Sequence, residues 1–154
     1  RSEKNPGLAY AAAEKLAGFM RFDHYGEPDP VRAGSINAHG VVTHDEVLVS
    51  MAKAHILLNT SLQEGGANAI CEAICLGLPV IASAIPGNVG MLGEDYLGYF
   101  PSDDLDALVG ILKKTAEDQV FYVQLKEQLI ARAPLFAYGS ESQSWRDLVS
   151  ELSK

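Results

Sequence analysis

The feature that most constrains the fold of this chain is an alternation between short apolar runs and segments with helical spacing. Residues 54–61 and 79–83 contain apolar runs of the length of buried strands, and the segment between them carries Ile70, Ala73 and Ile74 at helical spacing. Strands that alternate with helices favour a parallel, doubly wound α/β sheet, in which ligands bind beyond the carboxyl ends of the strands. We therefore expect an α/β fold with a ligand site at that edge.

The remaining sequence continues this alternation. We expect further helices at residues 8–17, 45–54, 105–117, 119–133 and 140–152, and further strands at residues 19–25, 35–42 and 97–101. The helix that holds Ile70 is expected to end at Gly77, and residues 86–90, with the sequence Pro-Gly-Asn-Val-Gly, are expected to form a tight loop. The expected helix-capping residues are Thr43 or His44, and Asp103 with Asp104.

Two glutamates flank the junction between the strand at 54–61 and the helix that follows it. Glu64 is expected in the turn above the strand, and Glu72 about one turn into the helix, where side chains lean back toward the N-terminus. The first N–H groups of a helix favour an anion such as a diphosphate, and Gly65 and Gly66 carry no side chains that would keep a ligand from the backbone. Both carboxylates can therefore reach one ligand.

The chemistry of a carboxylate suggests what the glutamates bind. Carboxylates accept hydrogen bonds from hydroxyl groups but repel phosphates, so we place Glu64 and Glu72 on sugar rings and leave phosphates to backbone N–H groups and cations. The alternative is that Glu64 only complements the helix dipole and that Glu72 is a solvated helix residue. The glutamate spacing alone favours neither interpretation.

Composition limits the classes of function. The chain has 154 residues, of which 47% are hydrophobic, enough for one globular domain with a substantial core. Its formal net charge of −8 and the lack of a Lys/Arg cluster argue against a nucleic-acid-binding surface. We find no membrane segment and no signal peptide, so a cytoplasmic setting is the default expectation, although a chain that starts at Arg1 can have lost its natural beginning.

The cysteines and histidines do not indicate a metal site. Cys71 and Cys75 have a spacing that can hold a metal, but small buried thiols on an apolar helix face are commoner, so we expect them in the core. His24, His39 and His44 lack paired carboxylate or cysteine spacing, and we expect satisfied loop histidines. We therefore expect no metal and no bound cofactor.

Taken together, these motifs resemble the C-terminal, donor-binding domain of GT-B fold glycosyltransferases, in the large retaining family 4 group. The resemblance covers most of the chain and implies a Rossmann-like parallel sheet that forms one half of a GT-B fold. It rests on residues 1–6, 44–47, 64–72, 77–83 and 86–88 and on the closing helix with Trp145. Within this group, residues 64–68, 85–90 and 93–96 are most similar to the bacterial selenosugar synthases of selenoneine biosynthesis.

The resemblance implies roles for individual residues. Arg1 and Lys4 match the basic pair that contacts the donor diphosphate and stabilises charge on the departing nucleoside diphosphate. Glu64 matches the glutamate that faces the transferred sugar, and Glu72 the glutamate that holds the ribose hydroxyls. The residues assigned to the turn that approaches sugar and phosphate are Gly65, Gly66, Ala67, Asn68 and Ala69. Without the resemblance, Arg1 and Lys4 are more simply two solvated cations at a frayed chain end.

Asn88 and Trp145 have two interpretations each. Asn88 either contacts the donor base or sugar or is an ordinary turn residue, and Pro-Gly-Asn favours the turn. Trp145 is expected to be a packing anchor, and it can pack against the acceptor-binding half of the fold. Residues 1–154 are expected to form one donor-binding domain that lacks the family's first, central strand, with the acceptor domain absent. The crossover at residues 27–34 is also short for two parallel strands, which commonly need about a dozen residues.

These observations support one main function and two alternatives. The first is a retaining glycosyltransferase domain that orients a UDP-type donor for transfer of a hexose or N-acetylhexosamine, inactive in transfer without the N-terminal domain. For the selenosugar synthases the resemblance implies UDP-N-acetylglucosamine as donor and selenophosphate as acceptor. The alternatives are a non-catalytic nucleotide-sugar-binding domain and a sugar-nucleotide epimerase of the same fold.

Overall fold

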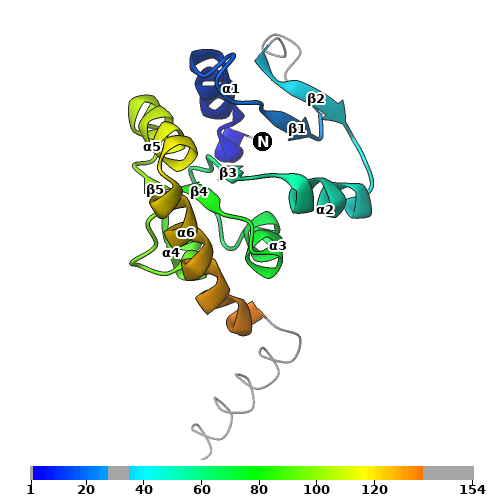
Figure 1. The fold of residues 1–154 in the computed structure, drawn as a ribbon. Coiled ribbons are helices and arrows are strands. Elements are labelled where there is room, and N and C mark those ends of the chain that lie inside the picture. The colour runs from blue at the N-terminus through cyan, green and yellow to red at the C-terminus, as the bar shows by residue number, and fades with distance from the viewer. Residues whose placement is uncertain (1, 28–34, 137–154) are drawn as a thin grey trace, which may run out of the picture.

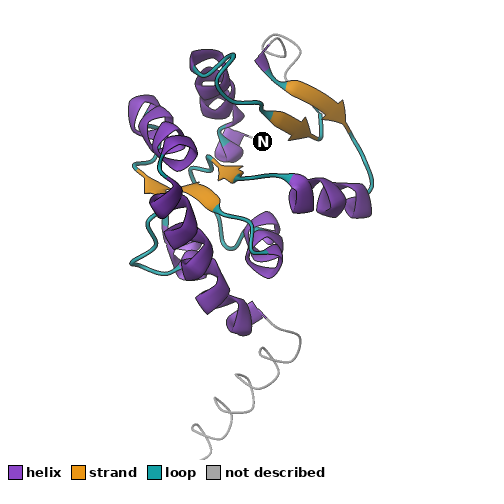
Figure 2. Cartoon of the chain, in the orientation of Figure 1, coloured by secondary structure: helices purple, strands orange, loops and turns teal. Residues whose placement is uncertain are grey.

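The computed structural model describes residues 2–27 and 35–136 as helices alternating with short strands (Figure 1). Figure 2 shows the same elements by type. In chain order they are η1 (Ser2–Lys4), α1 (Pro6–Lys15), β1 (Asp23–Tyr25), β2 (Asn37–Gly40), α2 (His44–Lys53), β3 (Leu57–Asn59), α3 (Asn68–Leu76), β4 (Val80–Ser83), α4 (Pro86–Leu92), β5 (Tyr99–Phe100), α5 (Leu105–Glu117), α6 (Gln119–Arg132) and η3 (Ala133–Phe136). The expected helix at residues 140–152, with Trp145, lies outside the described residues.

The strands of the described residues form two parallel sheets rather than one continuous sheet. One sheet has the order β3-β4-β5, with Leu57 opposite Val80 and Ala82 opposite Tyr99. The other is the pair β1-β2, which lies apart from the first sheet in Figure 1. The parallel pairing of every described strand confirms the expected α/β class.

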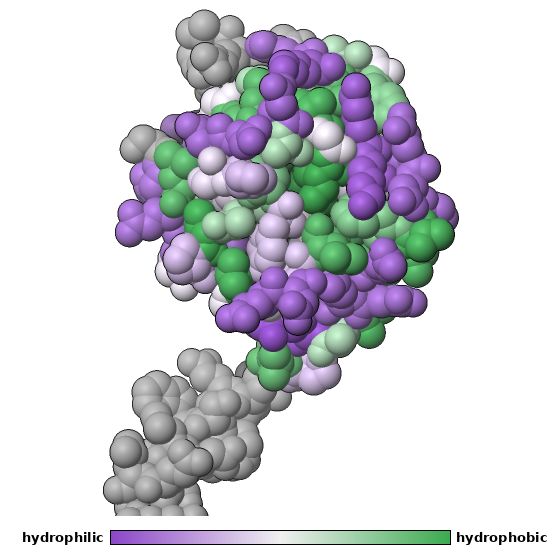
Figure 3. Space-filling model, turned by 90° about the vertical axis from the view of Figure 1, so that its left-hand side faces the viewer, coloured by the Kyte–Doolittle hydropathy of each residue, from purple (hydrophilic) through white to green (hydrophobic). Residues whose placement is uncertain are grey.

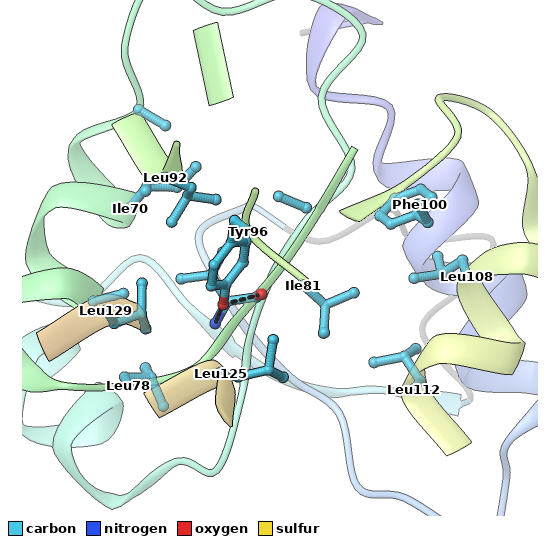
Figure 4. Packing of buried hydrophobic residues seen from close by; sticks show 14 of the residues in the cluster. Ile70, Leu78, Ile81, Leu92, Tyr96, Phe100, Leu108, Leu112, Leu125 and Leu129 are labelled. Atoms are coloured by element: carbon cyan, nitrogen blue, oxygen red, sulfur yellow. Dashed lines mark hydrogen bonds between the residues drawn. The ribbon is translucent and has the colours of Figure 1, made fainter. Parts of the chain in front are cut away.

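Helices cover both faces of the three-stranded sheet, which is the doubly wound arrangement predicted from the sequence. The central strand β4 is buried along its whole length. Its side chains alternate between the two faces, so each face receives its own layer of apolar residues. In Figure 4 one side of β4 holds Phe100, Leu108 and Leu112, and the other holds Ile70, Leu78, Leu92 and Leu129.

Tyr96 packs in this core and hydrogen-bonds to the first residue of β4. Its ring is buried in the hydrophobic cluster, and its hydroxyl donates to the carbonyl of Val80 at 2.7 Å and accepts from the amide of Val80 at 3.0 Å (Figure 4). Burial raises the pKa of this hydroxyl, so it stays protonated and can keep donating. Gly98 leaves the space for this arrangement, because a Cβ atom there would lie 2.3 Å from the Val80 carbonyl oxygen.

The segment at residues 86–90 is a helix, so the expected tight loop is wrong. Pro86 occupies the first turn of α4, where its fixed φ suits a helix and its missing N–H costs nothing. At the other end of α4, the Arg132 guanidinium donates to the carbonyls of Gly90 at 3.0 Å and Met91 at 2.9 Å. A contact from α6 thus satisfies carbonyls at the end of this short helix. The local sequence of residues 86–90 does not reveal this contact with a distant residue.

One expected strand is shorter than predicted, and two expected helix ends are confirmed. The strand expected at residues 19–25 is confined to β1, because the amides of Phe19 and Met20 donate to Leu16 and continue the turn after α1. Thr43 caps α2 in a capping box with Glu46, and Gly77 ends α3 in the left-handed conformation, both as predicted.

Asp104 caps α5 as predicted, but Asp103 does not cap it. The Asp104 side chain accepts from the amide of Ala107 at 2.9 Å. The Asp103 side chain instead accepts from Asn5 Nδ2 at 2.9 Å, which links the loop after β5 to the start of the chain. The two neighbouring carboxylates therefore have different partners.

The expected burial of the two cysteines is also wrong. Cys71 is half-buried and Cys75 is exposed, because the buried stripe of α3 consists of Ile70, Ala73 and Ile74. Positions 71 and 75 fall to the side of that stripe. Burial and the neighbouring Cys75 raise the pKa of the Cys71 thiol.

The surface mixes polar and apolar residues. Figure 3 shows one face of the molecule, on which hydrophobic residues lie among hydrophilic ones. Large apolar side chains that are exposed include Val41, Val120 and Ile130, and scattered residues of this kind are normal for a folded domain. Within residues 2–27 and 35–136, we find no helix with the length and apolar character that a bilayer span requires.

Candidate functional site

The segment before α1 lies at the carboxyl end of β3. The amide of Leu62 donates to the Glu3 carbonyl at 2.7 Å, and Thr60 Oγ1 donates to the carbonyls of Lys4 at 3.1 Å and Asn5 at 3.0 Å. Asn5 adopts the left-handed conformation, with φ of 45°, which turns the chain from η1 into α1. These contacts hold Lys4 beyond the strand end, where ligands bind in such sheets.

Lys4 and Glu64 form an ion pair at this edge, although they are 60 positions apart in sequence. The Glu64 side chain is only 9% exposed, whereas the Lys4 side chain is 44% exposed. Ser61 Oγ donates a further hydrogen bond to Glu64 Oε1 at 2.7 Å. The carboxylate is therefore fixed in position, while the ammonium group remains open to solvent.

The turn from Gly65 to Ala67 connects Glu64 to the N-terminus of α3. Gly65 and Gly66 are exposed, whereas Ala67 at the N-cap position is buried and its amide donates to Met91 Sδ at 3.2 Å. Ala67 has no side chain that could cap the helix, so no N-cap side chain occupies the first N–H groups of α3. Asn68 and Ala69 follow in the first turn of α3 and are exposed. A helix start of this kind favours an anion.

Glu72 faces α2 in this structure. Its carboxylate is 23% exposed and lies 3.7 Å from Nε2 of His44, the first residue of α2. The sequence separation between His44 and Glu72 could not reveal this contact, because the two residues come from different helices. The proximity makes His44 a candidate site residue that the sequence patterns missed, and the predicted contact of Glu72 with a ribose stays a prediction.

Gly87 and Asn88 lie behind the Glu64 turn. A Cβ atom at Gly87 would lie 2.1 Å from the Glu64 carbonyl oxygen, so the start of α4 packs directly on this turn. Asn88 is fully buried and donates from Nδ2 to the carbonyl of Ser83 at 2.9 Å. Its side chain points into the protein, and its predicted contact with a donor stays a prediction. Arg1, the other predicted cation, lies outside the described residues.

A second cluster of charged residues lies on the β1-β2 pair. Arg21 donates to Asp23 at 2.8 Å, His39 Nε2 lies 2.7 Å from the same carboxylate, and the rings of Tyr25 and His39 stack at 4.5 Å. The hydrogen bond from Arg21, together with that from His39, lowers the pKa of Asp23 below its ordinary value. The interactions of this cluster are satisfied among β1, β2 and Arg21, which lies just before β1.

Metal ligands do not gather anywhere in the part of the chain that the structure describes. No three histidine, cysteine, aspartate or glutamate side chains there approach closely enough to hold an ion. The chemistry available at the described edge is that of the Lys4 ammonium, the Glu64 carboxylate and the helix start of α3. Together they suit a ligand with both an anionic part and hydroxyl groups.

The chain is similar in structure to several proteins whose structures are solved. Sucrose-phosphate synthase from Thermosynechococcus elongatus matches with a TM-score of 0.79 and 21% identity, over 99% of this chain and 43% of its own chain. Anabaena HepE, solved with UDP-glucose, matches with a TM-score of 0.81 and 18% identity, over 98% and 46% of the two chains. The GtfA/B complex matches with a TM-score of 0.79 and 19% identity, over 98% and 34%.

These matches show the fold, and they show that the chain spans less than half the length of the solved proteins it resembles. The shared architecture is the doubly wound parallel sheet of one half of a GT-B fold, in agreement with the expectation from the sequence. The family model described as "Glycosyl transferases group 1" matches residues 8–118, which is most of the described chain. The chain therefore belongs to the glycosyl transferases of group 1.

Proposed function

We propose that this chain binds the nucleoside-diphosphate sugar donor of a glycosyl transfer reaction. The observation that carries the proposal is the Lys4–Glu64 ion pair, which lies at the carboxyl end of β3 beside the glycine turn and the N-terminus of α3. A cation, a carboxylate and a helix start at one edge match the diphosphate and the hydroxyl groups of such a donor. The UDP-glucose bound to Anabaena HepE, which has a similar fold, supports this ligand class.

In this proposal each part of the donor has its own partner. Lys4, with Arg1, takes the diphosphate and stabilises the negative charge that develops on the departing nucleoside diphosphate. Glu64 accepts hydrogen bonds from the transferred sugar, and Glu72 accepts those from the ribose. The backbone that approaches the sugar and phosphate belongs to Gly65, Gly66, Ala67, Asn68 and Ala69. None of these side chains acts as a covalent nucleophile.

The reaction itself requires more than these residues. We propose a retaining transfer of a hexose or N-acetylhexosamine from a UDP-type donor, with the acceptor held by a second, N-terminal α/β domain, as in family 4 enzymes. The share of the solved proteins that the chain spans, 43% and 46%, supports a two-domain arrangement. On this basis the chain by itself binds the donor but does not complete transfer. The cytoplasmic setting that we propose rests on the sequence alone.

Isothermal titration of the chain with UDP, UDP-glucose and UDP-N-acetylglucosamine tests the proposal. We expect Glu72→Ala to weaken the binding of UDP and of both UDP-sugars, because the ribose is common to all three. We expect Glu64→Ala to reduce mainly the gain in affinity that the sugar provides. Unchanged affinities in both variants would contradict the assignment of the site.

The same titration distinguishes the finer possibilities. A preference for UDP-N-acetylglucosamine, followed by transfer to selenophosphate when the complete enzyme is assayed, would support the selenosugar synthase group. Equal binding of the two UDP-sugars would oppose that refinement and leave the donor class intact. Donor binding without transfer by the complete protein would favour a non-catalytic binding domain, and interconversion of sugar epimers would favour an epimerase.

A further inference from the structure

We propose that Ser61, Ser83 and Asn88 are positioning residues that hold Glu64 in the orientation it needs to recognise the donor sugar. This inference rests on the proposed function, because it assigns a purpose to a hydrogen-bonded chain that ends on Glu64. Ser61 and Ser83 are not expected to touch the donor, and the role proposed here for Asn88 does not depend on its predicted contact with the donor. They come from the ends of two adjacent parallel strands and from the helix that follows the second strand.

The chain of hydrogen bonds runs from α4 to the carboxylate. Asn88 Nδ2 donates to Ser83 Oγ at 3.3 Å, the Ser83 hydroxyl donates to the carbonyl of Ser61, and Ser61 Oγ donates to Glu64 Oε1 at 2.7 Å. Each of the three residues is buried, so water does not compete freely for these bonds. A well-packed polar chain of this kind restricts the positions that its last member can adopt.

The direction of each bond is fixed by its neighbours. Asn88 Nδ2 faces three acceptors, which are the carbonyl and hydroxyl oxygens of Ser83 and Oδ1 of Asn59 at 3.4 Å. The amide nitrogen must occupy that side, because a flipped amide would place oxygen against oxygen. Ser83 Oγ therefore accepts from Asn88 and is left to donate toward Ser61. Every member donates in the direction of Glu64.

Asn59, the last residue of β3, contacts both Ser61 and Asn88. Its Oδ1 accepts from the amide of Ser61 at 3.1 Å and from Asn88 Nδ2. Ser61 is thus held at its amide, its carbonyl and its hydroxyl, and only the hydroxyl reaches the site. The two backbone contacts fix the position from which the Ser61 side chain donates to Glu64.

The backbone of the same turn is held by α4. Gly87 lies against the Glu64 carbonyl with no room for a Cβ atom, and Met91 Sδ accepts from the amide of Ala67. The helix that carries Asn88 therefore supports both ends of the Glu64 turn from behind. This placement explains how Asn88 can matter for donor binding while it is fully buried.

The difference between UDP and UDP-sugar affinity tests the proposal, because only the sugar is expected to contact Glu64. For Ser61→Ala we expect about a tenfold loss of UDP-sugar affinity, since one hydrogen bond to a charged group disappears, and less than a twofold change for UDP. Thr115→Val is the matched control, because it removes a buried hydroxyl that donates only to the Ile111 carbonyl on α5. We expect this control to leave both affinities unchanged.

The outcomes separate this inference from the proposed function. If the unaltered chain binds neither UDP nor UDP-sugar, both fail together. Two results would overturn the positioning role alone, provided that the unaltered chain binds UDP-sugar. In the first, Ser61→Ala binds UDP-sugar as well as the unaltered chain does. In the second, Ser61→Ala loses affinity for UDP and for UDP-sugar by the same factor. Thermal unfolding establishes that each variant is folded. Should Ser61→Ala not fold, Ser61→Cys keeps a donor at this position, although the S–H group is a weaker donor and slightly larger. A selective loss for UDP-sugar is again expected.

Discussion

Gly87 lies so close to the backbone of Glu64 that a Cβ atom at position 87 would be 2.1 Å from the Glu64 carbonyl oxygen. The neighbouring Glu64 carbonyl carbon would lie at 2.7 Å. Real Cβ atoms do not approach backbone atoms this closely, and the close-packed interior leaves α4 little freedom to move away. The absence of a side chain at Gly87 is therefore a condition for the position of Glu64.

Gly87→Ala is expected to move α4 away from the Glu64 turn. We expect a destabilisation of about 1–3 kcal/mol in denaturant unfolding, together with weaker binding of UDP-sugar. Gly90→Ala is a control in the same helix, because its Cβ atom would meet nothing within 4 Å. It should be neutral or stabilising by up to about 1 kcal/mol. Equal effects of the two substitutions would show that the contact with Glu64 does not matter.

Lys4→Met is expected to weaken UDP binding by at least about tenfold, because a charge-assisted contact with the diphosphate is lost. The remaining affinity should depend less on salt, which titration at two ionic strengths would measure. Stability should also fall, since the Glu64 side chain is only 9% exposed and its carboxylate loses the cation of this ion pair.

Lys15→Met provides the control for this charge change. Lys15 pairs with Asp106 at 2.7 Å between α1 and α5, so the variant also removes one exposed ion pair. We expect it to leave UDP affinity and its salt dependence as they are. If Lys15→Met and Lys4→Met weaken UDP binding equally, the effect comes from net charge and Lys4 has no specific role.

The alternation of strands and helices was predictable because buried strands and amphipathic helices leave opposite periodicities in the sequence. The position of Glu64 in a turn and of Glu72 within α3 followed from the same pattern. The ion pair between Lys4 and Glu64 was not predicted, since no local pattern joins residues 60 positions apart and the family resemblance only assigned both residues to one donor.

The parts that local patterns missed depend on tertiary contacts. Residues 86–92 have ordinary turn chemistry, yet they form a helix because Gly87 packs on Glu64 and Arg132 satisfies carbonyls at the far end. Asp103 has the same local signal as the capping residue beside it, but its partner is a residue at the start of the chain. Ser61 and Ser83 gave no signal, because a small polar residue at or just after the end of a strand is common.

Tyr96→Phe is expected to lower the free energy of unfolding by about 1–3 kcal/mol, because it leaves the buried amide and carbonyl of Val80 without their partner. Tyr99→Phe is the matched comparison. The half-buried Tyr99 hydroxyl donates to the Gly93 carbonyl at 2.8 Å and lies 3.4 Å from a second acceptor, the Asn88 carbonyl. Its loss should cost about 0.5–1.5 kcal/mol. Denaturant unfolding of both variants measures the difference, and an equal cost would contradict the role of Tyr96 in supporting β4.

Asp23 is expected to make the stability of the chain depend on pH in the acid range. The hydrogen bond from Arg21, and then that from His39, lowers its pKa in the folded state below the ordinary value of 3.8. The folded protein therefore favours the ionised carboxylate, and the unfolded chain binds the proton first as the pH falls. The stabilisation is complete well above pH 4 and is lost as the pH falls through the lowered pKa.

Asp23→Asn removes this titration, because an amide cannot ionise. We expect the variant to be less stable than the unaltered chain at pH 7, and the difference to shrink as the pH falls below about 4. Unfolding curves recorded at several pH values between neutrality and about pH 3 would measure this convergence. A difference that stays constant over that range would show that Asp23 contributes through packing or neutral hydrogen bonds, and that the charge held between Arg21 and His39 does not stabilise the β1-β2 pair.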